Sequence, residues 1–334
     1  MINNITKNIM KKILITGSSG YIGSSLYFYL KNIFKVKGID KKECKYFNVQ
    51  KINLLNKNKL NNLLKTFKPD LVIHLAAQSL VDETINKKKY YINNVIATKN
   101  LLYCLKKNHI NNLVFSSTAA VYKYKNRPLN EKDILKPLSN YAKTKYQCER
   151  LIKNSNLNSI ILRFFNVCSS MKIKKRIIGE LHDPETHLIP TVVYKCLFNK
   201  KIYIYGNNYK TKDGTCERDY IHIKDICSAL KKSVIKIFSS RKIFEIINIG
   251  SSSNISNLEI IDNVKKITKM AISYKIANNR KGDIDKLSCS SVKAKKLLSW
   301  YPVDSNVNKI IKDEILWVKF LKKNKIKRRF KNYL

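Results

Sequence analysis

The chain has 334 residues, of which 44% are hydrophobic, enough to bury a sizeable core in two domains or lobes. Lysine and arginine number 66 against 23 aspartates and glutamates, so the formal net charge is +43. The basic residues are spread through nearly every segment and form no single stripe, so we interpret the charge as compositional drift and expect no nucleic-acid partner. No apolar run approaches the roughly 20 residues that span a bilayer, which argues against a membrane protein.

The thiols and imidazoles are dispersed along the chain. Eight cysteines show no Cys-x-x-Cys pair, and the five histidines are equally scattered. We therefore expect reduced thiols, with neither a disulfide framework nor a metal site. Residues 1–12 carry charges and asparagines but no apolar signal-peptide core, so we expect a cytoplasmic protein.

A glycine loop opens the first structural unit. Residues 12–16 form a short apolar run typical of a buried parallel strand, and residues 24–30 follow a helical pattern. Between them, Gly17-Ser-Ser-Gly20-Tyr-Ile-Gly23 holds three of the nine glycines of the chain. A strand, a glycine loop and a helix in this order place backbone N–H groups and a helix N-terminus against a pyrophosphate. The spacing predicts a dinucleotide-binding unit.

A second predicted strand, residues 36–39, ends in Asp40. An acidic residue about 20 positions beyond the glycines suits the ribose hydroxyls of NAD. Lys41 and Lys42 follow directly and would suit a 2′-phosphate instead, so the sequence favours NAD and leaves NADP open.

Strands and helices alternate regularly up to residue 163. The pattern predicts strands at residues 71–77, 113–118 and 159–163, and helices at residues 57–67, 90–106 and 138–152. This alternation predicts an α/β fold with a doubly wound parallel sheet, whose functional residues lie at the carboxyl ends of the strands.

Beyond residue 163 the order becomes irregular and predicts a smaller, mixed α/β lobe. We expect a loop at residues 214–220, short strands at 243–249 and 272–276, and helices at 223–237, 257–269, 291–298 and 307–323, besides one that ends near residue 198. Residues 1–175 are assigned to an NAD-binding Rossmann domain, to which the chain returns around residues 219–250. Residues 176–334 are assigned to a substrate-binding lobe that ends in a basic tail, residues 322–334.

A proton-transfer site is predicted from Tyr141, Lys145 and Thr118. Tyr141 and Lys145 are four residues apart, so they share one face of a helix. A lysine ammonium near a phenol favours the phenolate, which brings a pKa near ~10 towards neutrality. The Thr118 hydroxyl, at the end of a predicted strand, would complete the site. Because Tyr-x-x-x-Lys arises easily in a lysine-rich chain, this prediction depends on the glycine loop.

Together the motifs closely resemble those of the UDP-glucose 4-epimerases, which are extended short-chain dehydrogenases of the NAD-dependent epimerase/dehydratase family. The resemblance runs from residue 12 to about residue 323, and the ordered set of motifs carries it. Besides the glycine loop and Tyr141/Lys145, the set comprises Asn93-Asn-Val95, Phe115-Ser-Ser-Thr-Ala-Ala-Val-Tyr122, Leu162-Arg-Phe-Phe-Asn166, Gly179-Glu-Leu-His-Asp-Pro-Glu-Thr-His-Leu-Ile-Pro190, Asp213-Gly-Thr-Cys-Glu-Arg-Asp-Tyr-Ile-His222 and Arg280-Lys-Gly-Asp283.

The resemblance implies an isomerase that interconverts UDP-glucose and UDP-galactose with tightly bound NAD. Tyr141 would take the proton from the sugar 4-hydroxyl, and hydride would leave C4 and return to the opposite face of a 4-keto sugar. Lys145 would lower the tyrosine pKa and hydrogen-bond the nicotinamide ribose, while Thr118 would bridge the sugar oxygen and Tyr141. A homodimer through the helices predicted at residues 90–106 and 138–152 is also implied.

The resemblance also implies the residues that bind each ligand. Those expected at the cofactor, besides Tyr141 and Lys145, are Gly17, Gly20, Tyr21, Ile22, Gly23, Asp40, Asn53, Leu54, Leu75, Ala76, Ala77, Asn94, Ser116 and Phe165. Those expected at the UDP-sugar, besides Thr118 and Tyr141, are Asn166, His187, Leu188, Tyr203, Tyr205, Arg218, Arg280 and Asp283. Guanidinium groups pair bidentately with phosphate, and lysine does not. The presence of arginine at positions 218 and 280 of a chain so rich in lysine therefore suits the binding of a diphosphate.

Alternatives stay open on the substrate. Related 4,6-dehydratases carry Asp-Glu directly after the threonine, whereas this chain has Ala119 and Ala120, which disfavours elimination. Leu287 falls where side-chain size gates N-acetylated sugars, and the 4-epimerisation of UDP-N-acetylglucosamine or UDP-glucuronate remains possible. A nucleic-acid-binding protein on a degenerate dehydrogenase scaffold is the less favoured alternative.

Overall fold

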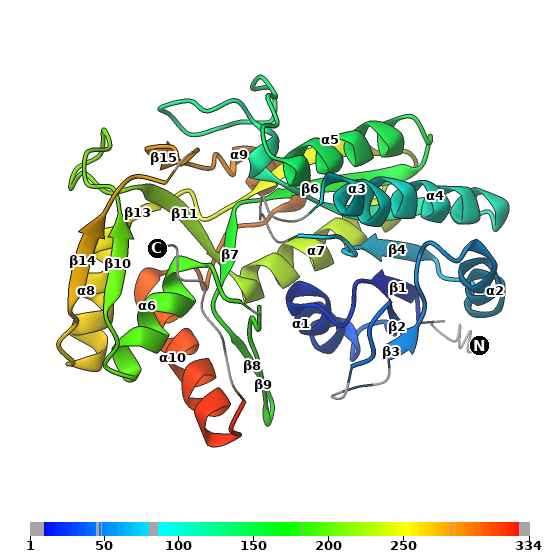
Figure 1. Ribbon diagram of the computed structural model, residues 1–334. Helices are drawn as coiled ribbons and strands as arrows, with labels where there is room; N and C mark the ends of the chain where they lie inside the picture. Colours follow the sequence, from blue (N-terminus) through cyan, green and yellow to red (C-terminus); the bar gives the residue numbers. More distant parts are fainter. Residues whose placement is uncertain are drawn as a thin grey trace, which may run out of the picture.

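The computed structural model describes residues 10–44, 47, 49–79, 86–182, 184–280 and 282–326. A large lobe contains a seven-stranded sheet between two layers of helices, and a smaller lobe lies beside it (Figure 1). The predicted basic tail begins within the last helix, and its residues 327–334 lie outside the described part of the chain. Among the described residues, no helix has the length and apolarity needed to span a membrane.

The large sheet is parallel throughout, and its strand order is β12-β6-β5-β4-β1-β2-β3. This is the doubly wound order, with the chain moving outward from β1 in both directions. The fold class predicted from the sequence is thereby confirmed. The strands are β1 Lys12–Thr16, β2 Lys35–Asp40, β3 Val49–Lys51, β4 Leu71–His74, β5 Asn112–Thr118, β6 Asn158–Phe164 and β12 Phe244–Ile249.

Alternate residues of each strand feed opposite faces of this sheet. On β1, Ile13 and Ile15 join one core with helices α1, α7 and α9, whereas Leu14 joins a second core with α2, α4 and α5. Both cores consist of residues with almost no exposed surface. The helices are α1 Tyr21–Leu30, α2 Lys57–Phe67, α3 Lys87–Tyr90, α4 Ala97–Lys107, α5 Asn140–Lys153, α7 Ile223–Phe238 and α9 Val292–Leu298.

The last strand of the large sheet comes from far along the chain. Residue 164 ends β6, the chain then passes through part of the smaller lobe, and β12 returns to pair with β6 over six residue pairs. Helix α7 leads into this return and packs on α1. The large lobe is therefore complete only when residues beyond 244 are in place.

The smaller lobe packs three helices against short strands. Its core contains Ile189 and Val193 of α6, Ile260 of α8 and Ile310 of α10. Its elements are β7 Asn166–Cys168, β8 Met171–Ile173, β9 Arg176–Ile178, α6 Leu188–Leu197, β10 Ile202–Tyr205, β11 Glu217–His222, β13 Asn254–Ser256, α8 Asn257–Thr268, β14 Tyr274–Ala277, β15 Lys286–Leu287 and α10 Val307–Lys323.

Three sequence predictions match the structure at both ends: the strand at 12–16 and the helices at 57–67 and 307–323. Three others are wrong in part. The loop expected at 214–220 contains strand β11, and the strand expected at 71–77 stops at His74. The single helix expected at 90–106 is α3, a π-helical segment Tyr91–Ile96 and α4 in succession.

Candidate active site

The glycine loop is shaped by close backbone contacts. Gly17 has φ +74°, and a Cβ there would lie 2.6 Å from the Ala76 nitrogen. A Cβ on Gly23 would lie 2.1 Å from the Gly17 oxygen, so the first turn of α1 packs directly on the loop. Gly20 is the N-cap of α1 and supplies no side-chain cap, which leaves first-turn N–H groups for an anion. These observations fit the pyrophosphate of a dinucleotide.

Asp40 ends β2 beside this loop. One carboxylate oxygen accepts a hydrogen bond from the Ser19 N–H at 3.1 Å, and the other accepts from the Lys42 N–H at 3.0 Å. The carboxylate is thus oriented at the carboxyl edge of the sheet, where ribose hydroxyls would bind. The Lys41 ammonium lies 3.5 Å from the Asn93 side-chain oxygen.

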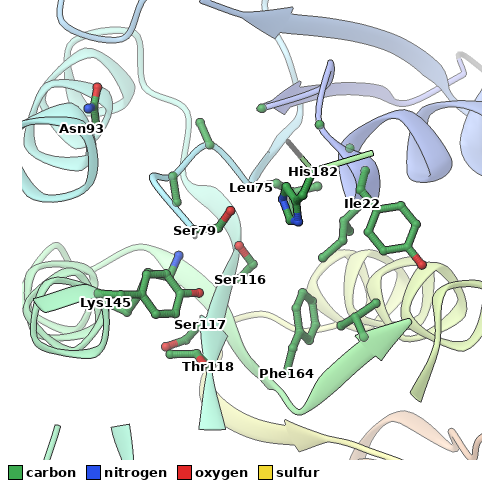
Figure 2. A pocket seen from close by; sticks show the side chains of 18 of the residues that line it. Ile22, Leu75, Ser79, Asn93, Ser116, Ser117, Thr118, Lys145, Phe164 and His182 are labelled. Carbon is green, nitrogen blue, oxygen red and sulfur yellow. The ribbon is translucent and has the colours of Figure 1, made fainter. Parts of the chain in front are cut away.

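A hollow of about 650 Å³ runs along the carboxyl edge of the sheet. In Figure 2, Ser116, Ser117 and Thr118 of β5 lie towards Lys145 of α5, and Ile22, Phe164 and His182 lie on the other side of the hollow. Every residue expected at the cofactor lines this hollow except Asn94. The structure therefore brings together cofactor residues whose positions in the chain range from 17 to 165.

Asn94 and Asn93 have different surroundings. Asn94 is buried, accepts from the Gln78 N–H at 2.7 Å, and donates to the Thr144 hydroxyl at 2.9 Å. Its amide thus ties the loop after β4 to α5. Asn93 lines the hollow instead; it belongs to a motif noted in the sequence but was not among the expected cofactor residues. Both belong to the π-helical segment, a type of turn that is frequent at functional sites.

Thr118 and Tyr141 meet where β5 ends and α5 begins. The Ser139 hydroxyl accepts from the Ala142 N–H at 3.1 Å and fixes the start of α5. The Thr118 oxygen accepts from the Ala120 N–H at 3.2 Å, which leaves its proton for the Tyr141 phenol. Burial raises the pKa of Tyr141 to about 12, and the Thr118 hydrogen bond opposes this rise. The direction is opposite to the one predicted from the Tyr-x-x-x-Lys spacing.

Lys145 lies deeper in the same site and is 2% exposed. Burial lowers the pKa of its ammonium to about 8, while Cys148 and Glu149 oppose the shift. Its nitrogen lies 4.2 Å from the centre of the Phe115 ring, which partly replaces the lost hydration by a cation–π contact. A cation is thereby held at the wall of the hollow at neutral pH.

A buried polar network links the strand that carries Thr118 to the helix that carries Tyr141 and Lys145. The Ser117 hydroxyl donates to Glu149 at 2.5 Å, and Arg163 pairs bidentately with Glu149 at 2.9 and 2.6 Å. Arg163 also donates to the Tyr122 hydroxyl at 2.8 Å, which in turn donates to Asn248 at 2.7 Å. The network joins β5, α5, β6 and β12, so the relative positions of Thr118 and Tyr141 depend on it.

A second hollow of about 240 Å³ continues the first into the smaller lobe. Leu188, Tyr203, Tyr205 and Arg218 line it, and Asn166, His187, Arg280 and Asp283 line both hollows. The expected sugar-nucleotide residues thus lie on one continuous surface.

Contacts within the protein orient the guanidinium groups of Arg218 and Arg280 on this surface. Arg218 donates to the Ile284 carbonyl at 2.8 Å and lies 3.4 Å from Asp283, and the Arg280 guanidinium stacks on Tyr205 at 4.0 Å.

Glu180 and His182 also line the large hollow, and the sequence did not propose them as site residues. Both belong to the segment between β9 and α6. The signal that pointed to this segment was the motif from residue 179 to residue 190, of which only His187 and Leu188 were selected.

Comparison with known proteins gives consistent similarities. The sequence model of the NAD dependent epimerase/dehydratase family matches residues 13–250. A UDP-glucose 4-epimerase of Lactobacillus helveticus is 34% identical over 92% of this chain and 97% of its own. The crystal structure of UDP-glucose 4-epimerase from Brucella ovis with NAD superposes with a TM-score of 0.86 at 28% identity, covering 92% of this chain and 98% of that one. A Stenotrophomonas maltophila epimerase with NAD and formylated UDP-arabinopyranose gives 0.88 at 25%, covering 94% and 99%.

Proposed function

This chain belongs to the NAD dependent epimerase/dehydratase family, and on that premise we propose that it interconverts UDP-glucose and UDP-galactose by inverting C4. The observation that carries the proposal is the meeting of Thr118, Tyr141 and Lys145 in a hollow that the glycine loop also lines. Curated relatives that align over nearly their whole length carry the same activity in their names.

NAD is the cofactor of this family, and the glycine cradle fits it. Bound in its oxidised form, it supplies a hydride acceptor for C4 and a positive charge. Residues 17–23 hold the pyrophosphate through backbone N–H groups, and Asp40 holds the adenosine ribose. We assign Lys145 to the nicotinamide ribose, because its ammonium is fixed at the wall of the same hollow.

Tyr141 is the base that takes the proton of the sugar 4-hydroxyl. Burial raises its pKa to about 12, so the phenol needs a further positive charge beside it to act as a base near neutral pH. Thr118 donates to the phenol oxygen and stabilises the phenolate that forms. The proton returns from Tyr141 to the sugar at the end of the reaction, so the residues are regenerated.

Ala119 and Ala120 restrict the outcome to epimerisation. Both line the large hollow directly after Thr118, and neither carries an acid or a base. Elimination of water across C5 and C6 needs proton transfer at those carbons. A 4-keto sugar bound here is therefore reduced again and not dehydrated.

The UDP moiety occupies the smaller lobe in this proposal. Arg218 and Arg280 bind the diphosphate, supported by their position in the second hollow and by the contacts that already orient them. Asn166, His187, Leu188, Tyr203, Tyr205 and Asp283 complete the pocket for the nucleotide and sugar. We propose residues 1–175, with the return at 219–250, as the cofactor domain and residues 176–334 as the substrate lobe. The exceptions are β7, β8 and β11, described above with the smaller lobe, and α9, which packs in the core of the large lobe.

The activity is tested with purified protein, NAD and UDP-galactose, without added reductant. UDP-glucose should form, and Tyr141→Phe should lower kcat by roughly 10²–10⁴-fold through loss of the proton acceptor. Tyr146→Phe on the same helix is the matched control and should keep activity. Absence of UDP-glucose at saturating NAD, or a fully active Tyr141→Phe enzyme, would refute the proposal.

The sugar preference is tested with a panel of UDP-glucose, UDP-N-acetylglucosamine and UDP-glucuronate. We propose glucose as the preferred sugar, because Leu287 lines the large hollow with a full-sized side chain. A faster 4-epimerisation of UDP-N-acetylglucosamine or UDP-glucuronate would reassign the substrate within the same chemistry.

We further propose a homodimer formed through α4 and α5, working in the cytoplasm. Tyr91 and Tyr103 on the helical segment expected at this interface are 41% and 56% exposed, which supports a partner surface. All eight cysteines are free thiols, which suits a reducing compartment. Light scattering tests the homodimer, since a monomer at micromolar concentration would contradict it.

A further inference from the structure

A lysine that the sequence did not propose as a site residue lines the second hollow. Lys195 lies in the last turn of α6, and Figure 1 shows α6 beside β10 in the smaller lobe. Its ammonium lies 5.7 Å from the centre of the Tyr203 ring on β10. The second hollow therefore contains a lysine ammonium besides the two arginines that we assign to the diphosphate.

Two aromatic rings of β10 order these cations along the hollow. Tyr203 and Tyr205 are two residues apart on one strand, so their side chains lie on the same face of β10, about 6–7 Å apart along it. The Arg280 guanidinium stacks on Tyr205 at 4.0 Å, whereas Lys195 lies against Tyr203. Arg280 lines both hollows, and Lys195 lines only the second. Lys195 is thus further from the candidate active site than the diphosphate, on the side where the nucleoside of a bound nucleotide would lie.

The Lys195 ammonium has no anionic partner in the protein. It forms no ion pair and no hydrogen bond with any residue that the structure describes. The carboxylates that line this hollow, Glu185 and Asp283, lie beside other side chains instead. Burial and the charge of Lys200 lower the pKa of Lys195, so its ammonium is incompletely solvated. A ligand in the hollow can therefore use it as a hydrogen-bond donor.

An ammonium can separate one pyrimidine base from another, because it donates hydrogen bonds and accepts none. The amide of Asn257 and the hydroxyls of Thr191 and Tyr203 line the same hollow, and these groups can donate or accept. They suit uracil and cytosine alike. The two bases differ at C4, where uracil presents a carbonyl oxygen and cytosine an amino group. A donor such as Lys195 stabilises the carbonyl and leaves the amino group without an acceptor.

We propose that Lys195 is a specificity-determining residue, which selects uridine nucleotides by donating a hydrogen bond to the 4-carbonyl oxygen of uracil. The base lies against Tyr203, and the diphosphate lies next to it along β10, at Arg218 and Arg280. This inference rests on the proposed binding of a UDP-sugar and adds the group that distinguishes UDP from CDP. It requires a hydrogen bond and not only a positive charge, because both nucleotides carry the same diphosphate.

The test compares the binding of UDP and CDP to the full chain in the presence of NAD, by calorimetry. The parent protein should bind UDP at least ~10-fold more tightly than CDP, since CDP cannot accept the hydrogen bond from the charged donor. Lys195→Met removes the donor and keeps an unbranched side chain. In this variant the affinity for UDP should fall at least ~10-fold, and the affinity for CDP should change by less than ~3-fold.

Lys200→Met is the matched control. Lys200 is exposed, lines neither hollow, and has its ammonium 5.6 Å from the centre of the Tyr194 ring. This variant removes the same charge from a nearby position and should keep the ratio of UDP to CDP affinity of the parent protein. Circular dichroism checks that both variants are folded.

An equal loss of affinity for UDP and CDP in Lys195→Met would overturn the proposal, because it would show attraction to the diphosphate alone. A parent protein that binds UDP no better than CDP, or binds neither, would overturn it as well. An assay of UDP-galactose epimerisation separates this inference from the proposed function. Selectivity that depends on Lys195 in a chain without epimerase activity would refute only the function, whereas an active chain whose selectivity is unchanged in Lys195→Met would refute only the inference.

Discussion

Replacing Arg163 by methionine removes the cation from the buried network beneath the candidate site. In the folded chain the Arg163 and Glu149 side chains are 2% and 4% exposed, and the pair is joined by two hydrogen bonds. The methionine fills much of the same volume but leaves the Glu149 carboxylate without its partner. The Tyr122 hydroxyl loses a donor as well.

The expected cost follows from this burial. Breaking a buried ion pair by removing one partner destabilises a protein by about 3–5 kcal/mol, mainly because a charge is left uncompensated. The double variant Arg163→Met/Glu149→Leu removes that charge too, so it should recover more than half of the loss. A remainder of about 1 kcal/mol is expected from the Ser117 hydroxyl, which no longer has its acceptor.

The two tryptophans of the chain allow the effect to be located. Trp300 packs in the core of the large lobe and donates to the Asp225 carbonyl at 3.2 Å, whereas Trp317 lies on α10 in the smaller lobe. In a Trp317→Phe background, urea unfolding followed by fluorescence reports on Trp300. The free energy of unfolding should fall by the amount above, with little change in the slope against urea.

An exposed ion pair provides the control. Lys51 and Glu43 are 3.2 Å apart with side chains 63% and 73% exposed, so Lys51→Met should cost roughly 0–1 kcal/mol. The reasoning fails if Arg163→Met costs no more than Lys51→Met. It also fails if the double variant is less stable than Arg163→Met alone.

Two further predictions concern the loop and the core of the large lobe. In Gly23→Ala the new Cβ lies 2.1 Å from the Gly17 oxygen, so Tm should drop and NAD binding should weaken at least ~10-fold. In the control Gly20→Ala the nearest contact of the new Cβ is 3.3 Å, so Tm should not change. Equal Tm values would contradict this account. Burial and the Lys145 charge lower the pKa of His74 to about 3, so the unfolded chain binds the proton more readily and stability is lost as pH falls below about 6.5. From pH 7 to pH 4 the wild type should lose about 3 kcal/mol relative to His74→Gln, and a pH-independent difference in urea unfolding would disprove it.

The hydrogen bonds of His74 explain why a histidine is tolerated inside an apolar strand. Thr98 donates to the Asn94 carbonyl, so its oxygen accepts from Nε2 of His74. Thr16 accepts from the Ala76 N–H and donates to Nδ1. Both ring nitrogens are satisfied in the neutral form, and a second proton would meet a donor. The partners of His74 are 58 and 24 residues away in the chain, so no local pattern in the sequence indicates them.

Strong periodic patterns and glycine spacing made the large lobe predictable. The parallel sheet, the glycine loop and the position of Tyr141 on a helix all follow from local runs of residues 12–163. Strand β11 was missed because Glu217, Arg218 and Asp219 do not look like a strand. Asp219 is buried nevertheless, and it accepts backbone N–H bonds from Ser251 and Ser252 at 2.7 and 2.9 Å. Such compensation is tertiary and leaves no local signal.

The site was harder to predict where function depends on the path of the chain. Most of the residues expected at the cofactor, which line the large hollow, could be inferred because the order of the motifs indicated a family. The π-helical segment turns Asn93 to the hollow and buries Asn94, and hydrophobic spacing does not reveal such a local shift in helical register. The direction of the Tyr141 pKa depends on burial, which is set by β5 and α5 together.

The late return of β12 has a consequence for synthesis of the chain. When β6 leaves the ribosome, its outer edge has no partner until about 80 more residues have been made. At about 5–20 residues per second, the open edge lasts about 4–16 s. Exposed strand edges are templates for pairing with other chains, so this interval is when aggregation is most probable. A formal net charge of +43 makes copies of the chain repel one another, which opposes such pairing until β12 has been made.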